Sequence, residues 1–228
     1  MFVKNHPAMK IGSSLVIADL HLGIEYDLWL NGVNVSDQTE RLANKVKLLM
    51  KKTRSKELII LGDIKNSIYM KRQEEKKITN FFELLPDISI TICKGNHDGM
   101  IEDILGKNIN VVSYTVRRGY ILTHGHRNIP KLKEKTVVIG HNHPGIRFRD
   151  SIGGSSVEQC WVIGMAKGKS KKVIFMPSFS SLAGTMPFNE IDQKNLLGPI
   201  AKTVVLKKSK VYLLDGTYIG HLGNLKKE

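Results

Sequence analysis

The sequence has no apolar segment of about 18 residues or more, the length that a membrane-spanning helix requires. Its first residues also lack the apolar stretch of a secretory signal peptide. Only two cysteines occur in 228 residues, Cys93 and Cys160, and they lie too far apart in sequence to indicate a disulfide framework. We therefore expect a cytoplasmic protein that does not enter a membrane, with Cys93 in the core because it lies in the apolar run 88–93.

Acidic residues are scarce relative to basic ones, 21 against 35, which gives a formal net charge of +14. Such an excess favours a polyanionic partner such as DNA or RNA. It is also typical of a lysine-rich proteome. The basic residues form many small clusters, among them Lys51-Lys52 and Arg117-Arg118, and no single block. The charge leaves both interpretations open.

The first half of the chain alternates apolar runs with amphipathic segments, and no internal repeat or long linker interrupts it. Asp37 is the expected N-cap of the first amphipathic helix, with Glu40 at its third position. Pro86 ends the second helix. The predicted strands of this half cover residues 14–18, 57–61 and 88–93.

After about residue 110 the pattern becomes mostly β. We expect an α/β fold in one domain over residues 1–228, with a parallel sheet packed on a mixed sheet and helices outside. Residues 25–37 form either a short helix near the mouth of a site or part of the core, and their apolar content favours the core. The predicted strands are 110–116, 119–123, 136–139, 162–165, 173–176 and a terminal hairpin of 203–206 with 210–214.

Five apolar runs are each followed directly by carboxylate, amide or imidazole side chains. The carboxyl ends of parallel strands meet at one edge of a sheet, so these side chains should converge there. One Asp-x-His or Gly-x-His is a weak signal, but packing does not explain five such endings in one chain. The five are Asp19-Leu20-His21, Gly62-Asp63, Gly95-Asn96-His97-Asp98, His124-Gly125-His126 and His141-Asn142-His143.

Carboxylate and neutral imidazole are ligands for divalent transition metals. Two cations about 3.5–4 Å apart need a shared anionic ligand, and a carboxylate can bridge them. Such a pair lowers the pKa of a shared water and neutralises the oxygens of a phosphate ester. The pattern therefore predicts a two-metal phosphoesterase with a metal-bridging hydroxide as nucleophile.

The motif order over residues 15–143 resembles that of the calcineurin-like metallophosphoesterase family, a two-sheet β-sandwich flanked by helices. The resemblance implies that His97 contacts the phosphate and protonates the leaving oxygen, and that Asp98 orients His97. It implies two divalent metals, manganese before iron, zinc or nickel. It assigns Asp19, His21 and His143 to one metal, Asn96, His124 and His141 to the other, and Asp63 as the bridge.

Residues 15–23 and 177–185 also resemble an archaeal subgroup related to the SbcD nuclease. One departure is Asn66, where family members often have Asp or His. His126 could support His124 from behind. Arg147 and Arg149 are interpreted as solvated.

Three functions remain open for this site. A nuclease or phosphodiesterase is favoured by the subgroup resemblance and the charge. A phosphatase or phosphodiesterase for nucleotides or cyclic nucleotides is favoured by a chain barely longer than the catalytic core. A non-catalytic scaffold is disfavoured, because every implied ligand is present. The sequence indicates no oligomeric state.

Overall fold

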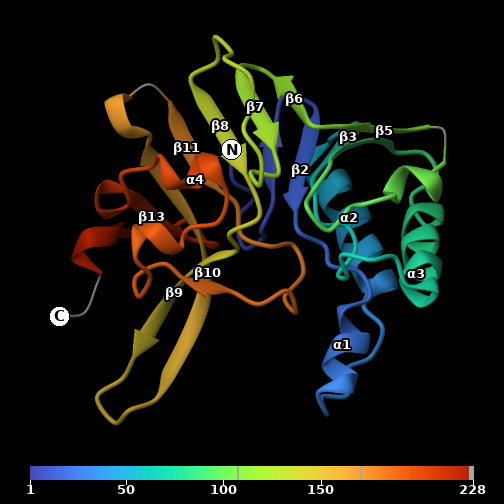
Figure 1. The fold of residues 1–228 in the computed structure, drawn as a ribbon, viewed down its shortest axis with the longest axis horizontal. Coiled ribbons are helices and arrows are strands. Elements are labelled where there is room, and N and C mark those ends of the chain that lie inside the picture. The colour runs from blue at the N-terminus through green and yellow to red at the C-terminus, as the bar shows by residue number, and fades with distance from the viewer. Residues whose placement is uncertain (107, 170, 226–228) are drawn as a thin grey trace.

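The computed structural model describes residues 1–106, 108–169 and 171–225. Two stacked β-sheets form the centre, with the longer helices outside the first sheet (Figure 1). That sheet has the order β1-β2-β3-β4-β5, and all neighbours are parallel except the β1–β2 pair. Its strands are β1 (Met9–Ile11), β2 (Ser14–Ala18), β3 (Glu57–Leu61), β4 (Ser89–Cys93) and β5 (Ile109–Val112).

The second sheet has the order β12-β9-β10-β11-β8-β7-β6, and the β13–β14 hairpin joins it through β10. Its central strands β11, β8 and β7 are parallel, whereas β10 is antiparallel to its neighbours. The strands are β6 (Tyr114–Arg117), β7 (Tyr120–Thr123), β8 (Thr136–Ile139), β9 (Pro144–Arg149), β10 (Ser155–Met165), β11 (Lys172–Phe175), β12 (Met186–Pro187), β13 (Lys210–Leu213) and β14 (Tyr218–His221).

Two long helices cover the outer face of the first sheet, and short helices lie elsewhere (Figure 1). Within the described ranges no helix is long and apolar enough to cross a membrane. The α-helices are α1 (Ile24–Leu30), α2 (Thr39–Thr53), α3 (Arg72–Glu83) and α4 (Pro199–Lys202). The 3-10 helices are Ile101–Asp103, Lys167–Lys169, Gln193–Asn195, Leu206–Lys208 and Leu222–Asn224.

The sequence of β2 is apolar from Leu15 to Ala18 because both faces of this strand are buried. Side chains alternate across a strand, so Leu15 and Ile17 pack against the helices, whereas Val16 and Ala18 face the second sheet. Cys93 lies in the same inter-sheet core, as predicted. A strand buried on both faces holds the residues that follow it in a fixed position, which is what a metal site requires.

The predicted α/β architecture with a parallel and a mixed sheet is confirmed, and several boundaries need correction. The α2 helix begins at Thr39 with Gln38 as its cap, although Asp37 does accept a hydrogen bond from the Thr39 N–H. The predicted strand 110–116 is two strands in different sheets, because the chain crosses between sheets at Ser113.

The predicted terminal hairpin is also wrong in part. Residues 203–206 form no strand; Val204 makes only a single bridge to Ala166. The hairpin is β13 with β14, joined by a turn that contains Asp215-Gly216, a standard hairpin signal.

The α1 segment differs from the favoured expectation that residues 25–37 belong to the core. Trp29 is 60% exposed and Leu30 is 58% exposed, so these side chains are not part of the core. Carboxylates bind the helix to the rest of the fold: Glu25 pairs with Lys77, and Asp27 pairs with Lys71. The favoured core interpretation of this segment was therefore wrong for its tip.

Lys45 on α2 gives a pH-dependent contribution to stability. Burial and the nearby Arg41 lower the pKa of Lys45 to about 8, although its ammonium lies 4.1 Å from the Phe179 ring centre. Between pH 8 and the ordinary lysine pKa the unfolded chain binds more protons, so stability rises with pH there. We expect the wild type to gain about 1 kcal/mol relative to Lys45→Met across that interval, a value reduced for partial exposure. Denaturant titrations at pH 7 and pH 10 measure this gain, and an unchanged difference would contradict it.

Candidate metal centre

The predicted ligands lie where strands of both sheets end, and their backbone is unusual. Five of them have positive φ angles in the left-handed region, which residues other than glycine rarely adopt. Strained backbone of this kind clusters at functional sites, where the surrounding fold holds it in place. The five are Asp19 (56°), His21 (46°), Asp63 (48°), His141 (67°) and His143 (41°).

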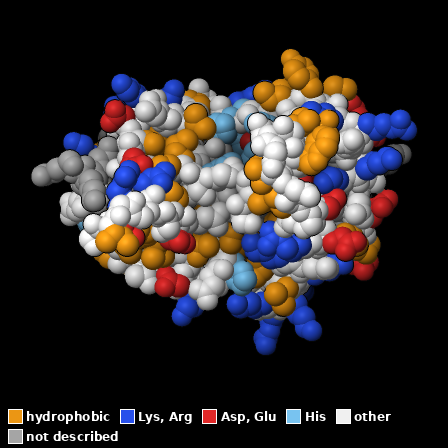
Figure 2. Space-filling model, turned by 90° about the horizontal axis from the view of Figure 1, so that it is seen from below, with side chains coloured by type: hydrophobic (Ala, Val, Ile, Leu, Met, Phe, Trp, Pro, Cys, Tyr) orange, Lys and Arg blue, Asp and Glu red, His pale blue; other side chains and the backbone are white. Residues whose placement is uncertain are grey.

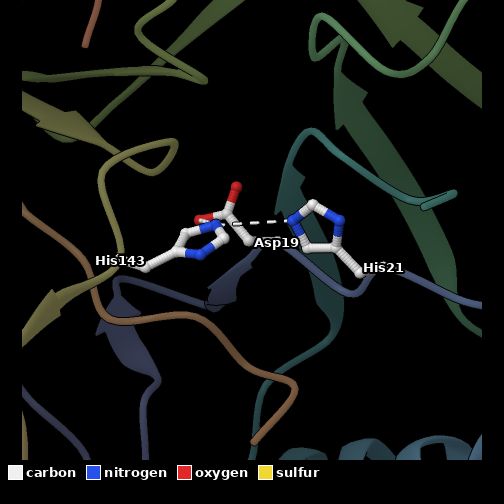
Figure 3. A group of neighbouring side chains, drawn as sticks. All are labelled: Asp19, His21 and His143. Carbon is white, nitrogen blue, oxygen red and sulfur yellow. Dashed lines mark hydrogen bonds and ion pairs between the residues drawn. The ribbon is translucent and has the colours of Figure 1, made fainter. Parts of the chain in front are cut away.

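One group of three side chains consists of Asp19, His21 and His143 (Figure 3). Each offers a ligand atom, and these atoms lie within 4.8 Å of one another. The two imidazoles face each other, with 3.4 Å between their Nε2 atoms, and His143 Nε2 lies 3.6 Å from Asp19 Oδ2. The Asp19 carboxylate also accepts hydrogen bonds from the His141 N–H, which fixes its orientation.

A second group of three consists of Asp63, His124 and His141, again with ligand atoms within 4.8 Å. His124 joins the two groups, because its Nε2 lies 3.2 Å from both Asp19 Oδ1 and Asp63 Oδ2. The same Asp63 oxygen lies 4.0 Å from His21 Nε2. The Asp63 carboxylate therefore faces both groups.

The charges of these side chains are shifted by their surroundings. Burial alone would lower the pKa of His124, but hydrogen bonds and attraction to Asp19 and Asp63 outweigh it and raise the pKa to about 10. Burial would raise the pKa of each carboxyl, yet the imidazoles keep both pKa values below the ordinary range. Burial lowers the pKa of His21 and of His141 to about 4, so both are neutral near pH 7.

The donor set fits divalent metal ions. Two carboxylates that stay ionised converge in a buried place with the neutral imidazoles of His21 and His141, and a buried negative charge has to be paired with a cation. The proton that the two carboxylates hold on His124 occupies the place of such a cation. The His21 Nδ1 atom is buried without a hydrogen-bond partner, which is costly unless another group binds there. His143 is oriented from behind, with Nδ1 3.0 Å from the Ala183 carbonyl, as is usual for a metal-binding imidazole.

His97 belongs to neither group of three, and its partner differs from the expected one. Its Nδ1 contacts the Asn66 backbone carbonyl. The Asp98 carboxylate instead accepts hydrogen bonds from the N–H groups of Ile64 (2.8 Å) and Gly95 (2.7 Å). The expected contact between Asp98 and His97 is therefore not formed; Asp98 fixes the two loops that deliver Asp63 and His97.

The loop that orients His97 contains a residue to which sequence reasoning gave no role. Lys65 is buried, and its ammonium donates to the carbonyls of Ser67 and Ile68, which closes the loop around it. The Asn66 side chain donates to Asp27 on α1. A lysine two residues after the aspartate that ends an apolar strand was the available signal, because a buried charged group there has to be paired.

His126 lies behind His124, with 3.0 Å between their Nδ1 atoms, in the supporting position that the sequence had left open. Asn96 is exposed and lines a cavity of about 340 Å³ together with His126 and Arg127. This cavity adjoins the second group. A substrate next to the metal centre therefore has room on this side.

Gly95 is the position where an added methyl group should disturb the centre most. A Cβ there would lie 2.2 Å from Asp63 Oδ1 and 2.3 Å from the Asp63 nitrogen. We expect Gly95→Ala to displace this carboxylate and to lower the rate of phosphoester hydrolysis about 100-fold, the usual effect of a 1 Å misplacement. Gly99→Ala is the control in the same loop, because its nearest atom would be 3.9 Å away. Equal rates for the two variants would contradict the prediction.

The family model for calcineurin-like phosphoesterases matches residues 13–186. The Pseudomonas putida nuclease MPE is 22% identical and has the same fold, with a TM-score of 0.59 over 89% of this chain and 85% of that one. Yfce, a phosphoesterase from E. coli, is 15% identical with a TM-score of 0.45 over 91% of this chain and 96% of that one. No curated protein sequence matches the chain. Because the model matches most of its length, the chain belongs to the calcineurin-like phosphoesterase family.

Proposed function

We propose that the protein is a two-metal phosphodiester hydrolase of the nuclease type. The observation that carries the proposal is the pair of three-residue groups at strand ends of both sheets. His124 Nε2 of the second group lies 3.2 Å from Asp19 Oδ1 of the first, and Asp63 Oδ2 of the second lies 4.0 Å from His21 Nε2 of the first. When bound, two divalent metals supply an activated water and neutralise the charge of the phosphate oxygens. Manganese is the first candidate from the family resemblance, and the carboxylate oxygens of the set suit it; iron, zinc and nickel, which suit imidazole, are the alternatives.

The chain's own residues have distinct roles in this proposal. One metal would be held by Asp19, His21 and His143, and the other by His124 and His141. The amide oxygen of Asn96, which lines the adjoining cavity, would complete the second set. Asp63 would bridge, since its Oδ2 faces both groups. His97 would donate a proton to the leaving oxygen; its Nε2 lies 4.0 Å from Asp63 Oδ2, close to the centre but outside both groups.

The charge of the chain supports a nucleic-acid substrate. The net charge of +14 favours association with a polyanion. The P. putida protein with the same fold is a nuclease, although 22% identity supports the fold alone. We further propose that the chain is related to the SbcD nuclease subgroup, which residues 15–23 and 177–185 resemble.

Hydrolysis of bis-p-nitrophenyl phosphate and p-nitrophenyl phosphate, with manganese and with chelator, tests the proposal. We expect manganese-dependent cleavage of the diester and little cleavage of the monoester. Preference for the monoester would indicate a small-molecule phosphatase. No hydrolysis of either ester by protein that binds manganese would indicate the scaffold function and would contradict the proposal.

A further inference from the structure

An exposed apolar surface continues from the metal centre. The segments that follow β2, β3 and β4 deliver the predicted ligands and His97, and the same segments then present large apolar side chains to solvent. Their exposed fractions run from 49% for Val33 to 85% for Tyr69. We call this surface the apolar rim; it consists of Trp29, Leu30, Val33, Ile68, Tyr69 and Met100.

The three segments of the apolar rim are held together. The Asn66 side chain donates to Asp27 of α1, and Lys71 pairs with the same carboxylate at 2.9 Å. On α1 the rings of Tyr26 and Trp29 are stacked, with 6.0 Å between their centres. The carbonyl oxygen of Ile68 lies 3.9 Å from the point that a Cβ on Gly99 would occupy, and Gly99 precedes Met100. These contacts hold the three segments that carry the rim next to one another.

The surface of the molecule agrees with this arrangement. Figure 2 shows histidine side chains inside a hollow between the two halves, and hydrophobic side chains gathered beside that hollow. In Figure 1 α1 extends from the edge where β2 ends. The rim therefore borders the site.

Such a rim needs an explanation, because exposed large apolar side chains that gather in one place mark binding surfaces. It lies on the His97 side of the centre, since the Asn66 carbonyl that contacts His97 belongs to the same loop as Ile68 and Tyr69. A general acid stands beside the leaving oxygen. Whatever contacts the rim is therefore attached to the leaving group of the substrate.

We propose that the apolar rim binds an unpaired nucleobase on the leaving side of the cleaved phosphodiester, with Trp29 and Tyr69 as stacking surfaces. The inference rests on the proposed function and specifies its substrate. A nucleobase is the flat, weakly polar group that a nucleic acid attaches next to each phosphate, and aromatic side chains stack on it without sequence preference. Lys71, which lies next to the rim, is already paired with Asp27. The rim therefore offers its ligand an apolar surface, and the charge of the phosphate is bound at the metal centre.

Trp29 provides a direct measurement. It is the exposed one of two tryptophans; Trp161 is fully buried and stacked on Phe2 with 4.1 Å between ring centres. We expect oligothymidylate, added to the full chain in chelator at low salt, to quench tryptophan emission. An abasic oligonucleotide of equal length and charge should not quench it, and should bind roughly 10-fold to 100-fold more weakly.

Three variants sharpen the test. Trp29→Phe should abolish the quenching, because only buried Trp161 remains, and should keep the affinity. Tyr69→Ala should reduce the affinity for oligothymidylate roughly 10-fold and leave abasic binding unchanged. Tyr218→Ala is the matched control, an aromatic side chain 47% exposed on β14, and should change neither.

Equal affinity for the base-containing and abasic oligonucleotides would overturn the inference, because it would mean that charge alone determines the binding. A shift of Trp29 emission with protein concentration, without oligonucleotide, would overturn it by indicating that a second copy covers the rim. Bis-p-nitrophenyl phosphate carries no nucleobase, so its hydrolysis tests the proposed function separately. Hydrolysis of the diester without base-dependent binding refutes only the proposal that the rim binds a nucleobase. Base-dependent binding without hydrolysis refutes only the proposal that the protein is a phosphodiester hydrolase.

Discussion

Asp63→Asn should lower the manganese-dependent rate of diester hydrolysis by more than about 1,000-fold. The substitution keeps the shape of the side chain and removes the charge that faces both groups. Charge stabilisation by a metal is worth several kcal/mol of the barrier, and about 4 kcal/mol corresponds to that factor. Kinetics with bis-p-nitrophenyl phosphate measure the rate, and titration calorimetry with manganese should show fewer than two ions bound per chain.

The control must separate a lost ligand from a lost fold. Asp63 Oδ1 also accepts a hydrogen bond from the His97 N–H at 3.0 Å, and the amide oxygen of asparagine can accept it as well. Asp103→Asn, on an exposed short helix, removes the same charge away from the groups of ligands and should retain the rate. Full activity of Asp63→Asn, or equal losses in both variants, would refute the bridging role.

Local sequence predicted the parts of the site that depend on one strand and the residues directly after it. The bounds of β2, β3 and β8 agree with their apolar runs because both faces of these strands are buried, which makes the hydrophobic signal continuous. Parallel pairing then aligns their carboxyl ends, so convergence of Asp19 and Asp63 followed from topology.

Contacts between loops could not be predicted in the same way. The family resemblance implied that Asp98 orients His97, yet the Asp98 carboxylate accepts hydrogen bonds from two backbone N–H groups instead. Backbone N–H groups that would otherwise be buried without a partner are expensive, and the sequence does not reveal where they are. The partner of His97 is the backbone carbonyl of Asn66, and the identity of a residue does not predict a contact made by its backbone.

For apolar residues outside a periodic pattern, the sequence also did not reveal whether the side chain is buried or exposed. Trp29 and Leu30 have the composition of core residues, and only the tertiary position of α1 shows that they face solvent. The β9–β10 pair escaped prediction for the opposite reason, because polar and charged residues occupy much of its length. Exposed ribbons lack the alternation that signals a half-buried strand.

His97→Asn should lower the rate about 10²-fold to 10⁴-fold for a diester with an alkoxide leaving group, and much less for bis-p-nitrophenyl phosphate. An alkoxide must be protonated as it leaves, whereas p-nitrophenolate is stable as an anion and gains little from a general acid. Manganese binding should remain at the wild-type level, because His97 belongs to neither three-residue group. Kinetics on both diesters and metal titration measure these effects.

His6→Asn is the matched control, a histidine on the N-terminal turn whose neighbours are lysines, and it should keep both rates. Equal losses of His97→Asn on the two diesters would mean that His97 only positions the phosphate. Loss of a metal would instead make it a ligand. A selective loss on the alkoxide diester alone requires a proton donor beside the leaving oxygen, which fixes the leaving group on the side of the Asn66 loop and the apolar rim.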